Sequence, residues 1–139
     1  MSNILFAVSG PIAGIKAAQT IPQLVQRGHQ VQVITTPSAL KFVGSTTWER
    51  LTNKAVIFDV FSKDIRWIIS HLARWADVLI LCPARANAIA NWANGMACDL
   101  PSTLFLAFER PKPIFVVPAM NAEFETKQEM ASLLERMIQ

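Results

Sequence analysis

The feature that most constrains the fold is a series of short, continuous apolar runs, each followed by a turn and then by residues with helical spacing. Ile4 to Val8 is the first run, and it ends at Ser9-Gly10-Pro11. A strand that is apolar at every position is buried on both faces, which is typical of a parallel sheet covered by helices. The N-terminal part of the chain therefore already predicts an α/β architecture.

The same alternation continues along the whole sequence. Further strands are predicted at 31–34, 78–82 and 114–117, with a weaker one at 55–58. Helices are predicted at 12–25, 39–43, 48–51, 64–75, 86–92 and 123–138, and 102–108 is another apolar segment. Because each crossover between parallel strands must carry a helix across the sheet, we expect an α/β domain with a doubly wound parallel sheet, and one domain over 1–139.

Composition excludes several classes of protein. Apolar residues make up 52% of the chain and charged residues 17%, which is too hydrophobic for a disordered protein. The net charge of +3 comes from scattered basic residues, so we expect no nucleic-acid surface, although an anionic small ligand would be favoured. The sequence has neither an apolar stretch of membrane-spanning length nor the layout of a signal peptide, so we expect no membrane association.

The two cysteines, Cys82 and Cys98, are too few for a disulfide framework, and their spacing does not suggest a metal site. We interpret both as buried structural thiols. This usage indicates a reducing compartment, and we expect a cytoplasmic protein without a metal.

Polar residues follow the predicted strands, at the sheet edge where doubly wound folds bind ligands. The first turn has Gly10 and Gly14 but lacks GxGxxG, and Thr35-Thr36 stands where a dinucleotide site would have an acidic residue, so NAD is disfavoured. A mononucleotide phosphate needs only turn amides, a helix end and hydroxyls. Candidates for these groups are Gly10, Pro11, Ile12, Thr35, Thr36 and Ser38. The alternative is that the Ser and Thr residues simply cap helices.

Several blocks of the chain carry a resemblance to a known family, and in chain order they are Ser9 to Ala17, Leu72 to Asp77, Pro83 to Ile89, Ala93 to Leu100 and Pro118 to Asn121. Together they resemble the FMN-dependent cysteine decarboxylases. That family includes phosphopantothenoylcysteine decarboxylase and the enzymes that decarboxylate the C-terminal cysteines of lantibiotic precursor peptides. The resemblance implies a flavodoxin-like Rossmann sandwich. It also implies homotrimers, sometimes assembled into dodecamers, with FMN between neighbouring subunits.

The resemblance also implies which residues hold the cofactor. Gly10, Pro11 and Ile12 would hold the phosphate region, and Ser38 would add a hydroxyl. The residues implied to line the flavin are Ala84, Arg85, Ala86 and Asn87. Pro11 stands where the family usually has Ser, which removes a hydroxyl and an N–H donor. Arg85 replaces a Ser or Thr; it could favour an anionic reduced flavin, meet a substrate phosphate, or form an interface salt bridge.

The implied reaction is decarboxylation of a small molecule or peptide that ends in cysteine. In the family, oxidation of the thiol by FMN gives a thioaldehyde, which is an electron sink one bond from the carboxylate. Loss of CO2 then gives an enethiol, which is reduced again in coenzyme A biosynthesis and stays oxidised in peptide maturation. Asn121, in Pro-Ala-Met-Asn, matches the family's Asn that faces the substrate carboxylate; the alternative is a cap of the terminal helix.

His71 is the candidate catalytic histidine, but its register is displaced. Alignment on Leu72 to Asp77 puts Ile69 at the family's catalytic position, and two residues turn a helical side chain by about 200°. His71 is therefore either functional through a local shift of register or an exposed or hydrogen-bonded helix histidine.

Other differences from the family's usual sequence leave open whether this chain decarboxylates a substrate. Family members usually continue past Pro-Ala-Met-Asn into a strand and a flexible clamp over the substrate, which in the coenzyme A enzyme carries a Cys for the reducing step. This chain ends at Gln139, and Phe124-Glu125 replaces a Met and an aromatic residue. A second hypothesis is therefore a homologue that binds FMN as a binding or regulatory subunit without decarboxylating. A third, a relative of prenylated-flavin synthases, is disfavoured by the Pro-Ala-Met-Asn block.

Overall fold

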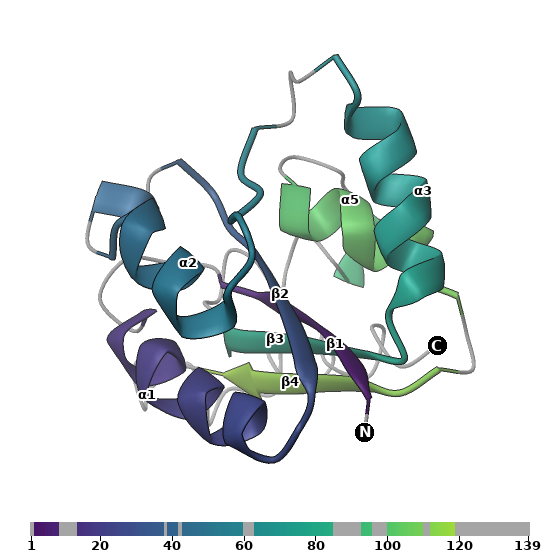
Figure 1. Ribbon diagram of the computed structural model, residues 1–139. Coiled ribbons are helices and arrows are strands. Elements are labelled where there is room, and N and C mark those ends of the chain that lie inside the picture. The colour runs from purple at the N-terminus through teal and green to yellow at the C-terminus, as the bar shows by residue number, and fades with distance from the viewer. Residues whose placement is uncertain are drawn as a thin grey trace, which may run out of the picture.

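The structure is a computed structural model that describes residues 2–8, 14–37, 39–41, 43–59, 63–84, 93–95, 100–109 and 112–118. Its centre is a four-stranded sheet with helices on both faces (Figure 1). The strands are β1 (Asn3–Ala7), β2 (Gln30–Ile34), β3 (Val78–Ala84) and β4 (Ile114–Pro118). Their order across the sheet is β2-β1-β3-β4, and every neighbouring pair is parallel, which confirms the predicted doubly wound α/β fold.

The helices divide between the two faces of the sheet. They are α1 (Gly14–Gln26), the 3-10 helix η1 (Ala39–Lys41), α2 (Ser45–Thr52), α3 (Ile65–Trp75) and α5 (Leu100–Ala107). In Figure 1, α1 and α2 lie on one side of the sheet, and α3 and α5 lie on the other. None of the described helices is long and apolar enough to cross a membrane.

The alternation of side chains along β1 explains this division. Ile4, Phe6 and Val8 pack into a core cluster that also contains Ile21 of α1 and Trp48 of α2. Leu5 and Ala7 point the other way, into a second cluster with residues of α3 and α5. Successive side chains of a strand face opposite sides of the sheet, so a central strand must be apolar throughout to serve both clusters.

The edge of the sheet departs from the sequence prediction. The weak strand predicted at 55–58 is a single bridge, in which Ile57 pairs with Ile34 of β2. Part of the pairing is made by a side chain instead, because Gln32 Nε2 donates a hydrogen bond of 2.8 Å to the Ala55 carbonyl. An edge segment held in this way needs no regular ladder, so it falls short of a full strand.

Two other segments differ in type or length from what the sequence specified, and two predicted helices cannot be compared. The apolar segment predicted at 102–108 is a helix, α5, and β3 continues to Ala84, past its predicted end at Cys82. A short apolar run does not by itself distinguish a buried helix from a strand, which is why the sequence left its type open. The helices predicted at 86–92 and 123–138 lie entirely outside the described residues.

Lys112, just before β4, ties that strand to the end of α3. Its Nζ donates hydrogen bonds to the carbonyls of Ala73, Arg74 and Ala76, at 3.2, 3.3 and 3.0 Å. The last carbonyls of a helix have no partners within the helix and carry partial negative charge, so a cation there stabilises the helix end. The Lys112 ammonium therefore stabilises both the C-terminus of α3 and the entry into β4.

We expect Lys112→Met to lower the free energy of unfolding by about 1–2 kcal/mol, because the aliphatic stem remains but three carbonyls lose their charged donor. Urea denaturation monitored by circular dichroism measures this change. Lys41→Met removes the same charge from an exposed position on η1 and serves as the control. Equal midpoints for the two variants would contradict the role given to Lys112.

Candidate functional site

The order of the strands reverses at β1. The chain passes from β1 to β2 on one side, and later returns to pair β3 on the other side. Ala7, at the end of β1, lies opposite Ile34 of β2 and Leu81 of β3. Doubly wound sheets bind ligands outside the carboxyl ends of the strands at such a reversal. We therefore expect the ligand in a crevice outside the carboxyl ends of β1 and β3, which is the candidate site and which we call the β1/β3 crevice.

The chain leaves β1 from a fixed point. The Val8 amide donates to the Ile34 carbonyl at 2.9 Å, and the Val8 carbonyl accepts a hydrogen bond of 3.1 Å from Thr35 Oγ1. Val8 and Thr35 are both fully buried. Both peptide groups of Val8 are thus held by the end of β2, so the turn that follows starts from a rigid anchor.

Helix α1 begins at Gly14, a few residues after this anchor. The first N–H groups of a helix have no partners within the helix, and with the helix dipole they favour an anion. The segment between Val8 and α1 contains the predicted phosphate ligands Gly10, Pro11 and Ile12, which lie outside the described residues. A phosphate site in this segment stays a prediction.

Thr35 and Thr36 have different roles. Thr35 is a candidate cofactor ligand, and the structure uses its hydroxyl to position Val8. Thr36 Oγ1 accepts a hydrogen bond of 3.3 Å from the Ala39 amide, at the start of η1. The capping alternative is therefore confirmed for Thr36, while a contact between Thr35 and the cofactor stays a prediction. Ser38 lies outside the described residues.

The carboxyl end of β3 brings two predicted loops together. Ala84 pairs with Pro118 of β4, after an irregularity in register that begins at Leu81. The segments that follow these two residues therefore start from neighbouring positions at the carboxyl ends of β3 and β4. Those segments contain the predicted ligands Arg85, Ala86, Asn87 and Asn121, which lie outside the described residues.

His71 lies apart from these groups, on the exposed side of α3. Its imidazole stacks on the indole of Trp67, with ring centroids 4.9 Å apart and planes 3° from parallel. Ile69, at the family's histidine position, packs against the core cluster between α3, α5 and the sheet. The two side chains thus point in different directions, as the helical spacing predicts.

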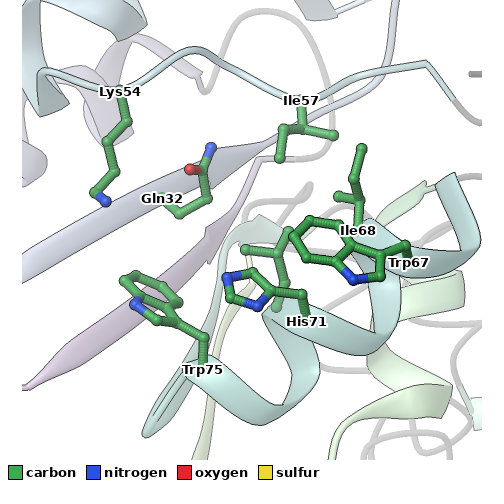
Figure 2. Close-up of a pocket in the computed structure, with 8 residues that line it drawn as sticks. Gln32, Lys54, Ile57, Trp67, Ile68, His71 and Trp75 are labelled. Atoms are coloured by element: carbon green, nitrogen blue, oxygen red, sulfur yellow. The ribbon is translucent and has the colours of Figure 1, made fainter. Parts of the chain in front are cut away.

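A cavity of about 180 Å³ separates α3 from the edge of the sheet, and we call it the β2/α3 cavity. In Figure 2 the side chains of Trp67, His71 and Trp75 follow one another along α3, and those of Gln32, Lys54 and Ile57 face them from the sheet edge. The lining is completed by Ile68 and Leu72. His71 therefore belongs to this cavity, together with residues of the outer edge of β2.

The cavity was not predicted from the sequence. The one pattern that could have indicated it is the spacing of four residues between Trp67, His71 and Trp75, which puts these side chains on one face of a helix. Trp48 is buried in the core, whereas Trp67 is 64% exposed. Within the described part of the chain, no group of three or more His, Cys, Asp or Glu side chains could hold a metal ion.

Comparison with known proteins gives consistent results. Residues 1–137 match the family described as Flavoprotein. The coenzyme A biosynthesis bifunctional protein CoaBC of Bacillus subtilis is 43% identical over 121 residues, covering 86% of this chain and 29% of that protein. A probable phosphopantothenoylcysteine decarboxylase of Streptococcus mutans is 38% identical over 123 residues, covering 87% of this chain and 69% of that protein.

The similarity extends to solved structures. The FMN-dependent cysteine decarboxylase SpaF superimposes with a TM-score of 0.81 and 27% identity, over 99% of this chain and 79% of that one. This chain spans about a third of the CoaBC protein, so the similarity concerns one part of that bifunctional relative.

We expect Thr35→Val to lower the free energy of unfolding by about 1–3 kcal/mol, because the buried Val8 carbonyl would lose its hydroxyl donor without a replacement. Thr35→Ser keeps the hydroxyl and is the matched control, with a smaller loss from the missing methyl group. Urea denaturation of both variants measures the difference. If Val and Ser at this position gave the same stability, the hydrogen bond would not be the anchor described above.

Proposed function

Because the chain belongs to the flavoprotein family, we propose that it binds FMN in the β1/β3 crevice and decarboxylates a cysteine-derived carboxylate. The observation that carries this proposal is the fixed exit from β1, where Thr35 and Ile34 hold Val8 at the reversal of strand order. A rigid start to the turn suits a phosphate site, because the turn amides then need little reorganisation on binding.

The groups proposed to hold the cofactor come from the ends of three neighbouring strands, β1, β2 and β3. Gly10, Pro11 and Ile12 would offer backbone groups to the phosphate, with the N-terminus of α1 behind them and Ser38 beside them. Pro11 has no N–H, so the donors would be its neighbours. Ala84 to Asn87 would line the flavin, which when bound supplies the oxidation of a substrate thiol and so the electron sink for decarboxylation.

Asn121 is the proposed ligand of the substrate carboxylate. The pairing of Ala84 with Pro118 supports this role, because the Asn121 segment and the flavin-lining segment leave neighbouring strands side by side. The Streptococcus mutans relative is named for the substrate phosphopantothenoylcysteine. The sequence resemblance implies the alternative, a peptide that ends in cysteine. We propose a role in coenzyme A biosynthesis in the cytoplasm, since the bifunctional relatives carry that name.

We further propose a homotrimer or a dodecamer with the cofactor between subunits. His71 is exposed and lines the β2/α3 cavity at the edge of its own sheet. We therefore propose no role for it at the crevice of its own subunit.

A second function is favoured by one observation. Ile69 occupies the position of the family's catalytic histidine and packs against the core, so that position offers no proton donor or acceptor. A homologue that binds FMN without decarboxylating would fit this residue. The two functions share the cofactor and differ in turnover.

We expect the purified chain to bind FMN with an absorption band at about 450 nm, and to bind riboflavin at least about ten-fold more weakly. Riboflavin lacks the phosphate, and charge-assisted hydrogen bonds to an anion are the stronger class. Equilibrium dialysis with each flavin measures the ratio. Equal affinities would contradict the phosphate site, and no binding of either flavin would remove the proposal.

We expect the FMN-loaded chain to release CO2 from phosphopantothenoylcysteine or from a peptide ending in cysteine. Asn121→Ala should lower the rate about 100-fold, since misplacing a reacting group costs on this order. Gln19→Ala, on the exposed side of α1, is the control for loss of an amide. Bound FMN without CO2 release from either substrate would instead support the non-enzymatic homologue.

A further inference from the structure

The β2/α3 cavity lies away from the crevice proposed for FMN. It is bounded by α3 on one side and by the outer edge of β2, with Lys54 and Ile57, on the other (Figure 2). The crevice lies at the carboxyl ends of β1 and β3, whereas Gln32 enters the cavity from the middle of β2. The volume of the β2/α3 cavity is about 180 Å³, which has room for a small ring with one substituent, and the cavity is partly open to solvent.

The walls of the cavity suit a planar ring. Trp67 and His71 stack in parallel, with their ring planes 3° apart, and Trp75 follows on the same face of α3. Aliphatic side chains of Ile57, Ile68 and Leu72 complete the apolar lining. Flat aromatic walls favour a flat ligand, because offset-stacked and edge-to-face pairs of rings attract beyond the burial of area.

The charge of the cavity suits an anion. Lys54 Nζ lies 5.3 Å from the centroid of the Trp75 ring, so the ammonium sits at the apolar wall. Of the described lining residues, none is acidic. An anionic group on a ring bound here would meet a cation that has no carboxylate beside it among these residues.

The polar part of the cavity is also held in place. The Thr52 hydroxyl accepts a hydrogen bond from the Lys54 amide at 3.2 Å and donates one to the Lys54 carbonyl at 3.1 Å. Gln32 Nε2 is held by the carbonyls of Ala55 and Val33, at 2.8 and 3.1 Å. Both sides of the cavity are therefore largely preorganised, which lowers the cost of binding a small ligand.

We propose that the β2/α3 cavity is a binding site for a small aromatic carboxylate, stacked on the rings of α3 and paired with the Lys54 ammonium. This site is additional to the FMN crevice.

The test is a titration of the full chain, saturated with FMN, with benzoate as the probe. Two-dimensional NMR of the indole N–H groups follows Trp67 and Trp75 separately, after assignment by substitution of each with Phe. We expect saturable shifts of these two signals with a Kd on the order of 1 mM, in keeping with so small a ligand. Benzamide, which lacks the charge, and cyclohexanecarboxylate, which lacks the flat ring, should each bind at least about five-fold more weakly.

Matched variants separate the two contributions. Lys54→Met should weaken benzoate about five-fold and leave benzamide unchanged, whereas Trp67→Ala should weaken both aromatic probes. Trp67 is 64% exposed, so its loss should leave the fold intact. Lys41→Met, on the opposite face of the sheet, removes the same charge elsewhere and should change nothing.

Three results would overturn the proposal. They are the absence of saturable shifts at Trp67 and Trp75, equal binding of benzoate and benzamide, and equal behaviour of the Lys54 and Lys41 variants. A change of these indole signals with protein concentration, without probe, would show instead that a second copy of the chain fills the cavity. The outcome is separate from cofactor binding, because a colourless protein that binds benzoate in this way would contradict only the proposed function.

Discussion

The hydrogen bond from the Thr35 hydroxyl to the Val8 carbonyl fixes the place where the chain leaves the sheet. Together with the bond from the Val8 amide to Ile34, it holds the ends of β1 and β2 at the same level. The reversal of strand order at β1 puts the expected ligand site next to this anchor. The turn into α1, and any anion bound by it, therefore depends on a side chain from the neighbouring strand.

Much of the fold could be predicted because β1 and β3 are central strands. Burial on both faces requires apolar residues at every position, and such runs are visible in a sequence without any alignment. The edge of the sheet was harder to predict, since it is held by one bridge at Ile57 and by the Gln32 side chain, which donates to the Ala55 carbonyl. The helical nature of α5 was also hidden, because a helix that packs on α3 and the sheet with most of its residues buried has little polar face to reveal its period.

The candidate site was predictable in its location and less so in its details. The rule that ligands bind at the carboxyl ends of parallel strands selects the segments after β1 and β3 from sequence alone. The hydrogen bond from the Thr35 hydroxyl could not be predicted, because its partner Val8 lies 27 residues away in the sequence. The β2/α3 cavity is a similar case, since Lys54 and Trp75 meet only after α2 and α3 have packed on the sheet. Helical spacing did predict that Ile69 and His71 face in different directions.

We propose two sites on this sheet: a crevice for a flavin phosphate at the reversal of strand order, and an aromatic cavity at the outer edge. The first is central, and a crystal structure of the chain grown with FMN tests it most directly. We expect the phosphate to lie against residues 10–12, beyond Val8, and the flavin ring to lie over the carboxyl end of β3. A flavin bound at any other place on the sheet, with those residues empty, would contradict it.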